Sequence, residues 1–502
     1  MLFARRDILL GAAVGAVLGL PAKAVRAATP FSAAEVDRIA RRLAGAPYQA
    51  PSTDVPADLA GIGYDGYRGL RPARSRLIFP DSPIQLEPMP RGGPLYRDRI
   101  ELSTVDGGQA QPIPFDPAAY AEVPAGVRLP TDPEFGFSGF RLLGELNRPG
   151  LIDEIAVFQG ASYFRALGRG SLYGLSARGL ALGTGGPAEE FPVFRAFWIE
   201  RPAADGSLRV HALLDGPSVA GAYHMNIRPG EMTRFDIAAR LYPRVALGAA
   251  CVAPMSSMFR SGSASARRFD DYRPAVHDSD GLEIWTGRDE RLWRPLGNPT
   301  ALAISAFADE SPKGFGLMQR SRDFADFEDA EAHYHQRPNL WVEPLGDWGR
   351  GSVQLLEIPT ENEYHDNVAA FWRPAAPWPA RREVRLAYRL HWGNAAVAPN
   401  PPLRVKATRT GARFAGNQTE NTRFYAVDYE PDRNAGELNS LSPVVSASAG
   451  TISDARLEII PGGLARASFA FAPPASGTAD LRLNLAPGGT PVGETWLMRW
   501  PS

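Results

Sequence analysis

Cysteine and lysine are scarce in this sequence. Of its 502 residues one is cysteine, Cys251, and the lysines are Lys23, Lys313 and Lys406. A single thiol excludes an intramolecular disulfide, a cysteine-based zinc site and an iron–sulfur cluster. Lysine and arginine number 54 against 55 aspartates and glutamates, which gives a formal net charge of −1. Because this balance provides no basic footprint for phosphates, we expect no nucleic-acid partner.

Long apolar runs are scarce too. The uncharged stretch from Ile8 to Ala22 is about 15 residues long, whereas a membrane-spanning helix needs about 20. Arg5-Arg6 precedes it, and Val25-Arg26-Ala27 is similar to a signal-peptidase site. The pattern predicts that residues 1–27 are an export signal of the twin-arginine type, with an uncleaved anchor as the alternative. We therefore expect a soluble periplasmic protein with no stable membrane insertion after the signal is removed.

Common catalytic and cofactor motifs are also missing. Residues 174–179 miss the spacing of a nucleophile elbow by one position, and neither a phosphate-binding GxxxxGK[ST] loop nor a dinucleotide-binding GxGxxG turn is present. Cys251 lies in an apolar run, which is typical of a buried, inert thiol. His333 and His335 are two positions apart, so on a helix they would point in different directions. We therefore expect no metal and no cofactor.

Glycine and proline are abundant by contrast, with 50 and 46 residues. They disfavour long helices and suit a β-rich fold with many turns. Apolar and polar residues alternate over 384–392, which predicts a half-buried strand, and leucines alternate again over 481–485. Two helices are expected: one over 31–45, which opens with an S-x-x-E capping box, and one over 323–335, where apolar residues recur every third position.

The domain organisation follows from a proline-rich stretch. Residues 394–402 hold three prolines and few apolar anchors, which predicts a linker. The segment before it, 28–393, is expected to form one large β-sandwich. The segment after it, 403–502, has several short strand-like runs and turns, which favours an immunoglobulin-like sandwich without the cysteine pair. The expected fold class is thus all-β, with a large N-terminal β-sandwich and a smaller C-terminal one.

Two acidic segments are candidates for chemistry. Residues 273–282 hold two aspartates in a polar stretch with proline and glycine near its ends, and the alternative interpretation is a loop in which they cap backbone amides. Residues 357–368 hold three acids within six positions, and the alternative there is a solvated hairpin loop. Where such carboxyls lose water, at least one pKa rises, and an acid that stays protonated can protonate a leaving-group oxygen.

Aromatic rings are dense around both segments. They are Trp285, Trp293, Tyr334, Trp341, Trp348, Phe371 and Trp372. Flat apolar faces edged by polar side chains are what a carbohydrate site needs, although each ring taken singly is better explained as core. Paired carboxylates among aromatic rings, in an exported protein without metal or cofactor motifs, point to glycoside chemistry.

Six runs of residues resemble one known family, the osmoregulated periplasmic glucan biosynthesis proteins G and D (the MdoG family). The runs are 197–202 (FWIERP), 274–282 (PAVHDSDGL), 293–296 (WRPL), 312–317 (PKGFGL), 337–344 (RPNLWVEP) and 366–367 (DN). The resemblance spans essentially the whole mature chain, and the twin-arginine leader makes it closer to protein D. It implies a galactose mutarotase-like large sandwich, an immunoglobulin-like C-terminal domain, and internal hydrolysis of β-1,2-glucan with inversion of configuration.

The resemblance also implies roles for residues. By motif, Asp366 is expected to be the general acid and Asp278 the general base. Residues expected to line the site, bind substrate or steer protons are Tyr334, Glu363, Asp280, Trp341 and Arg337. The implied partner is β-1,2-glucan, and a homodimer is left open.

Two other functions stay open at this point. A non-catalytic scaffold that guides nascent glucan needs the same aromatic groove but no acid pair, so the presence of both aspartates favours the enzyme. A sugar epimerase is suggested only by the mutarotase-like sandwich. That chemistry relies on a histidine and a glutamate, and no histidine here has a clear claim to the role.

Overall fold

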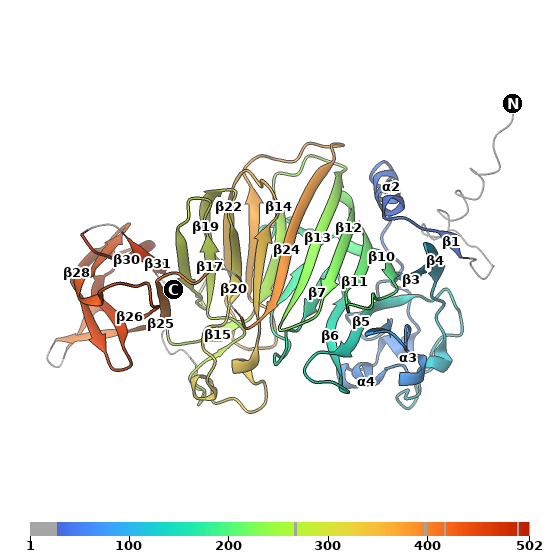
Figure 1. Cartoon of the computed structure of the whole chain (residues 1–502), viewed down its shortest axis with the longest axis horizontal. Helices are drawn as coiled ribbons and strands as arrows, with labels where there is room; N and C mark the ends of the chain where they lie inside the picture. The colour runs from blue at the N-terminus through green and yellow to red at the C-terminus, as the bar shows by residue number, and fades with distance from the viewer. Residues whose placement is uncertain are drawn as a thin grey trace. The chain divides into compact units, whose positions relative to one another are not determined.

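The computed structural model describes residues 28–265, 269–395, 397, 399–415, 418–488 and 491–500. The predicted export signal, residues 1–27, lies outside them. Strands dominate the described chain, so the all-β prediction is confirmed (Figure 1). The chain divides into two compact units that are each discontinuous in sequence. Unit 1 contains the described residues up to 169 with 177–253 and 376–390, and unit 2 contains 170–176, 254–375 and the residues from 391 on.

Unit 1 holds two sheets. One follows the order β1 (Thr29–Pro30), β4 (Gln109–Pro112), β3 (Glu101–Asp106), β10 (Val193–Glu200), β11 (Leu208–Asp215), β12 (Val219–Arg228), β13 (Met232–Pro243) and β24 (Val384–Gly393). The other follows β2 (Ile84–Pro90), β5 (Phe137–Glu145), β6 (Ile152–Gln159), β7 (Tyr163–Ala166), β8 (Ser176–Arg178) and β14 (Ala250–Ser257), with β9 (Leu180–Leu182) beside β14. The strand predicted over 384–392 is thus found as β24.

Aromatic rings hold these two sheets face to face. Phe140 of β5 meets Phe197 of β10 edge to face, with ring centroids 5.0 Å apart. Phe164 of β7 meets Phe235 of β13 at 5.7 Å. All four rings are almost completely buried, and each contributes about 1.5–3 kcal/mol by leaving water. Inward-facing rings on both sheets are what makes unit 1 a sandwich.

The helix predicted over 31–45 is confirmed as α2 (Ala33–Ala44), which buries Val36, Ile39 and Ala40 against its sheet. Its capping box is not formed, because the Ser32 side chain makes no cap hydrogen bond and Glu35 is instead paired with arginines one and two turns on. Two short helices, α3 (Ala57–Ala60) and α4 (Tyr64–Gly69), and two 3-10 turns, Arg74–Arg76 and Pro117–Ala119, complete the helical content of unit 1 as described.

Unit 2 contains strands of four sheets. The largest follows β21 (Asn339–Pro344), β20 (Gly314–Met318), β17 (Gly281–Trp285), β18 (Arg291–Pro295), β31 (Val492–Trp500), β30 (Ala479–Ala486) and β27 (Ser442–Ala447). A second follows β19 (Ala303–Glu310), β22 (Arg350–Glu357) and β23 (Val368–Pro374), and a third pairs β15 (Phe259–Ser261) with β16 (Val276–His277). The fourth follows β25 (Leu403–Ala415), β26 (Gln418–Pro431), β29 (Leu464–Ala472) and β28 (Thr451–Ile460).

The C-terminal strands, β25 to β31, form a second sandwich. Tyr425 of β26 and Phe469 of β29 pack on Trp496 of β31, with ring centroids 5.7 and 5.9 Å apart. The sandwich is also continuous with its neighbour, because β31 pairs in parallel with β18, and Trp293 of β18 belongs to the same buried core. The proposed domain boundary at 394–402 stays a prediction, since contacts group both sides of it into unit 2.

The helix expected over 323–335 is wrong. The segment contains only a 3-10 turn at Phe324–Asp326 and the start of another at Tyr334–Gln336. Glu328 and His333 adopt left-handed backbone angles, with φ of 52° and 50°, which an α-helix does not tolerate. Between them Asp329 accepts hydrogen bonds from the amides of Glu331 and Ala332. These amides therefore bond to a side chain instead of to the backbone carbonyls of a helix.

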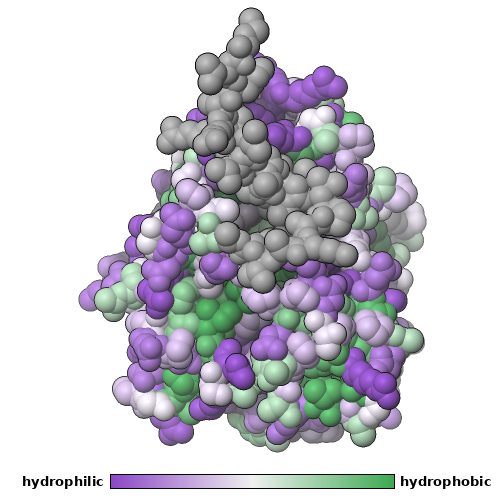
Figure 2. Space-filling view, turned by 90° about the vertical axis from the view of Figure 1, so that its right-hand side faces the viewer, coloured by the Kyte–Doolittle hydropathy of each residue, from purple (hydrophilic) through white to green (hydrophobic). Residues whose placement is uncertain are grey.

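The surface agrees with the composition. Figure 2 looks onto the side of unit 1 that carries α2 and β1, where polar side chains surround small, separate apolar patches. In the part of the chain that the structure describes, no helix is long and apolar enough to cross a membrane. Cys251, on β14, is completely buried, as expected for an inert thiol.

Candidate active site

The candidate site surrounds the C-terminal end of β14. This end of the strand belongs to unit 2. The loop 358–367, which joins β22 to β23, meets this end through the amide of Asn367, which donates to the carbonyl of Ser257 at 3.0 Å. The turn that follows β16 meets the same end through the amide of Asp278, which donates to the carbonyl of Met258 at 2.9 Å. Both acidic segments found in the sequence therefore flank one short stretch of backbone.

Asp366 lies exposed at the end of the first loop. The hydroxyl of Ser256 donates to its Oδ2 at 2.6 Å, and that hydroxyl is 2.8 Å from the hydroxyl of Ser176. The next residue, Asn367, is buried, and its side-chain amide takes the place of a backbone hydrogen-bond partner. Its amide side chain accepts from the amide of Phe259 at 2.8 Å and donates to the carbonyls of Phe259 and Ile358 at 3.0 and 2.8 Å. The Asp-Asn pair thus combines an accessible carboxyl with a rigid anchor beneath it.

Asp278 is buried by contrast, with 8 % of the residue exposed. Nε of Arg337 lies 3.4 Å from its Oδ1, an ion pair that favours the carboxylate form. Its neighbour Ser279 is completely buried, and the Ser279 hydroxyl is 2.8 Å from that of Ser257. The two aspartates therefore have different surroundings, one open and held by a hydroxyl, the other enclosed and paired with a cation.

The segment 174–176 faces both aspartates. A Cβ placed on Gly174 would lie 3.4 Å from Cγ of Asp278 and 3.2 Å from Cβ of Arg337, so a larger residue there would press on the stem of Arg337. Two positions on, Ser176 bonds to Ser256, which holds Asp366. Alternate residues of an extended chain point to the same side and are about 7 Å apart. The segment therefore links the surroundings of the two aspartates, with Gly174 beside Asp278 and Ser176 bonded to the serine that holds Asp366.

Arg273 organises the other polar residues of the site. Its Nη2 donates to Oε2 of Glu363 at 2.6 Å and to Oδ2 of Asp271 at 2.9 Å, and its Nη1 donates to Oδ2 of Asp329 at 2.6 Å. These three carboxylates come from three separate loops. A planar guanidinium with five donors is suited to such bridging, whereas a lysine is not. Glu363 is thus fixed in place by charge.

Tyr334 lies next to this cluster and is buried, with 3 % exposed. Burial raises the pKa of its hydroxyl well above the ordinary value, and the charges of Glu363 and Asp278 raise it further. The guanidinium of Arg337 lies over its ring, 5.3 Å from the centroid. The structure therefore brings Tyr334, Glu363 and Arg337 together with Asp278, as the sequence prediction requires.

Asp280 and Trp341 are placed differently. Oδ2 of Asp280 accepts from the amides of Arg320 and Ser321 at 2.6 and 2.7 Å, so the carboxylate fixes a turn. Trp341 is 3 % exposed and packs in the core shared with the C-terminal sandwich. A ring with no open face cannot stack on a sugar, so we leave both residues out of the substrate-binding proposal below.

No role was predicted from the sequence for four contributors to the site. Ser176 and Ser256 were not singled out, whereas Arg273 lies in the acidic segment 273–282 and Asn367 in the matched run 366–367. Ser256 lies at the penultimate position of the buried strand β14, and Arg273 directly precedes the matched run 274–282. Their partners lie far away in sequence, 110 residues for Ser256 with Asp366 and 90 for Arg273 with Glu363. No local pattern reports such contacts.

Replacing Arg273 with methionine is expected to destabilise the protein by about 3 kcal/mol, because three carboxylates lose their shared cation. Arg273 holds the pKa of Asp271 well below its usual range. A depressed pKa contributes stability above the unfolded value of about 3.9 and loses it as pH falls. Urea unfolding of both proteins should therefore show a difference that shrinks below about pH 4. A difference that does not change with pH would contradict this assignment.

The fold and the site together define a class: an all-β protein in which an open and an enclosed aspartate flank the end of one strand. Among the residues described here, no three histidine, cysteine, aspartate or glutamate side chains are grouped as metal ligands.

Comparisons with known proteins agree with this class. Residues 31–500 match the family described as "Periplasmic glucan biosynthesis protein, MdoG". Glucans biosynthesis protein G of Vibrio cholerae serotype O1 is 47% identical over 471 residues, 93% of this chain and 86% of that protein. Glucans biosynthesis protein G of Shewanella sp. strain MR-7 is 44% identical over 480 residues, 94% of this chain and 87% of that protein. The chain belongs to the periplasmic glucan biosynthesis protein family. The closer likeness to protein D rests on residues 1–27 and stays a prediction.

Proposed function

We propose that this protein is an inverting endo-β-1,2-glucanase acting on the backbone of periplasmic glucans. The observation that carries the proposal is the pair of aspartates with contrasting surroundings at the end of β14. Membership of the glucan biosynthesis family supports the substrate class. Inverting glycosidases need one carboxylic acid and one carboxylate on opposite faces of the sugar, with room for a water molecule between the carboxylate and the ring.

In the proposed reaction, Asp366 donates a proton to the glycosidic oxygen. The hydroxyl of Ser256 donates to its Oδ2 at 2.6 Å and so helps to hold the carboxyl in place. Asp278, which is paired with Arg337, takes a proton from water, either directly or through the neighbouring Tyr334 and Glu363. The water oxygen bonds to the anomeric carbon as the glycosidic bond breaks, so a β-linkage gives an α-product.

Product analysis tests this proposal. Linear β-1,2-glucan should yield shorter chains whose new reducing ends are first α, as seen by NMR during the reaction, while β-1,3- and β-1,4-glucans stay intact. Binding of β-1,2-glucan without shortening would instead identify a non-catalytic scaffold. Initial β-product would exclude inversion and with it the assigned roles.

We also propose that the protein works in the periplasm after export by the twin-arginine route. The family description and the predicted signal in residues 1–27 support this location. Replacing Arg5 and Arg6 together with lysine should keep the precursor in the cytoplasm, as fractionation of cells would show. A precursor that is still processed would contradict the route. A homodimer stays an expectation.

A further inference from the structure

Two tyrosines beside the candidate site are almost fully exposed. Tyr272 is 75% exposed and Tyr364 is 83% exposed. Tyr364 follows Glu363 directly and is two residues from Asp366, and Tyr272 lies between Asp271 and Arg273. Burying a ring of this size is worth about 1.5–3 kcal/mol, so two exposed rings beside one site leave apolar area available to a ligand.

The backbone beneath both rings is held firmly. The amide of Tyr364 donates to the side chain of Asn362 at 3.0 Å, and the carbonyl of Glu361 accepts from Nε of Arg260 at 3.1 Å. Arg260 also binds Asp271 at 2.6 Å, and Arg273 binds both Asp271 and Glu363. The ion pairs therefore join the loop of Tyr272 to the loop of Tyr364. The side chains next to the tyrosines point into this network, while the rings point away from it.

An exposed ring on an ordered loop loses little further conformational freedom when it binds a ligand. Ordering costs at an interface fall when the binding group is already in place. A tyrosine offers a flat apolar face and a hydroxyl, which suit a pyranose with its apolar C–H face and equatorial hydroxyls. Because both rings adjoin the loops that hold Asp366 and Glu363, a chain that reaches Asp366 also passes them.

We propose that Tyr272 and Tyr364 bind glucose units of the glucan by stacking, next to the point of cleavage. This inference deepens the proposed function and rests on it. Tyr364 serves units near Asp366, and Tyr272 serves units on the far side of the Arg273–Glu363 ion pair. Long glucan chains therefore gain binding affinity from both rings, and chains too short to reach Tyr272 gain affinity from Tyr364 alone.

The test compares Tyr272→Ala, Tyr364→Ala and a matched control, Tyr64→Ala. Tyr64 lies on α4 of unit 1 and is 64% exposed, so its removal matches the loss of an exposed ring. Calorimetric titration with linear β-1,2-glucan should show affinity lowered roughly 3- to 10-fold for each site variant. The control should keep wild-type affinity, and Tyr→Phe at either site should restore most of the loss. In hydrolysis, KM should rise with kcat little changed.

The outcomes separate this inference from the proposed function. Unchanged affinity in both alanine variants overturns the inference, even where the wild-type protein hydrolyses glucan. Lowered affinity in a wild-type protein that binds but does not hydrolyse supports stacking and rejects the glucanase. Changed oligomeric state in the variants with unchanged glucan affinity overturns the inference in favour of a protein interface.

Discussion

Replacing Asp366 with asparagine is expected to lower kcat on β-1,2-glucan by about 10²–10⁴-fold, the usual contribution of a positioned acid. The asparagine keeps the shape of the side chain, and its Oδ1 can still accept from Ser256. It carries no transferable proton, so KM should change little. Release of reducing ends, measured at saturating glucan, checks this result.

The matched variant Asp278→Asn is expected to give a loss of the same order, since an amide cannot take a proton from water. Asp280→Asn provides the control within the same motif. Its Oδ1 can still accept from the amides of Arg320 and Ser321, so activity should stay near that of the wild type. Near wild-type activity in both Asp366→Asn and Asp278→Asn would reject the assignment, and a large loss in Asp280→Asn would show that the motif is structural throughout.

The largest effect on stability is expected at Arg320, which is buried between two glutamates. Its Nη2 donates to Oε1 of Glu494 at 2.6 Å and to Oε2 of Glu283 at 3.0 Å, and its Nη1 donates to Oε2 of Glu494 at 2.8 Å. The guanidinium also lies 3.4 Å from the ring centroid of Trp293. Arg320→Met leaves two buried carboxylates without this partner, which costs about 3–5 kcal/mol.

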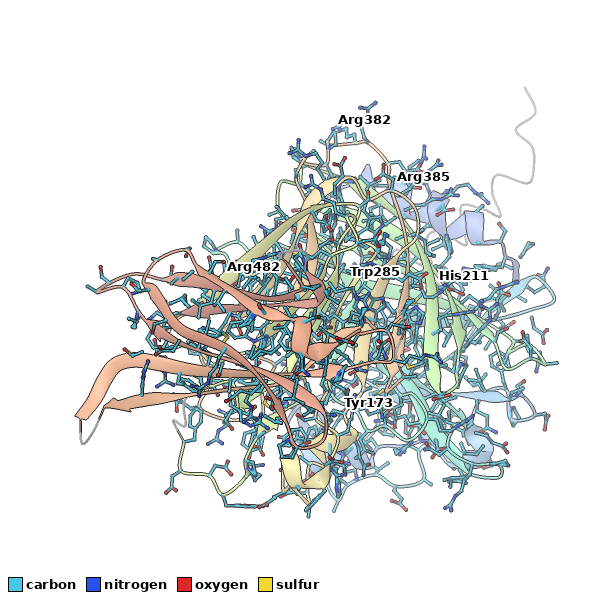
Figure 3. All side chains as sticks on the ribbon, turned by 60° about the vertical axis from the view of Figure 1, so that its left-hand side comes forward. Tyr173, His211, Trp285, Arg382, Arg385 and Arg482 are labelled. Carbon is cyan, nitrogen blue, oxygen red and sulfur yellow. The ribbon has the colours of Figure 1, made fainter. Side chains whose placement is uncertain are left out.

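The control for this prediction is Arg482→Met. Arg482, labelled in Figure 3, lies on β30. It pairs with Glu290, and both side chains are partly open to water. Exposed ion pairs contribute about 0–1 kcal/mol, so the free energy of unfolding in urea should barely change. Equal losses in both variants would contradict the role of burial. Because Arg320 contacts β31 and also Val405 of β25, its loss should weaken the C-terminal sandwich and the neighbouring sheet together.

The sequence predicts those features of the fold that depend on neighbours in the chain. The alternation over 384–392 and the apolar face of 31–45 are local, and β24 and α2 were predicted on that basis. The pattern over 323–335 is equally regular, yet Arg273 binds Asp329 from 56 residues away and the backbone turns instead of coiling. Tertiary contacts override local spacing where a buried charge needs a partner.

The residues of the candidate site also fall into those that a motif predicts and those that only the folded chain brings together. Asp366 and Asp278 came from a resemblance of motifs, and their catalytic roles stay predictions. Trp341 illustrates what composition cannot decide, because an aromatic ring beside polar residues suits a sugar site and a core equally well. Its burial follows from packing with the C-terminal sandwich, whose strands begin about 60 residues later in the chain. Ser256 and Arg273 could be found only once the chain was folded.

Each of the two units is formed by several separate segments of the chain, and this limits how chimeras of the protein can be designed. The backbone passes between them after residues 169, 176, 253, 375 and 390. No single cut separates the units, and no end-to-end fusion of two ready-made parts would produce them. A chimera that transfers unit 2 between relatives must therefore exchange 170–176, 254–375 and the residues from 391 on as one set. A crossover at any one junction would leave foreign strands to pair with each other.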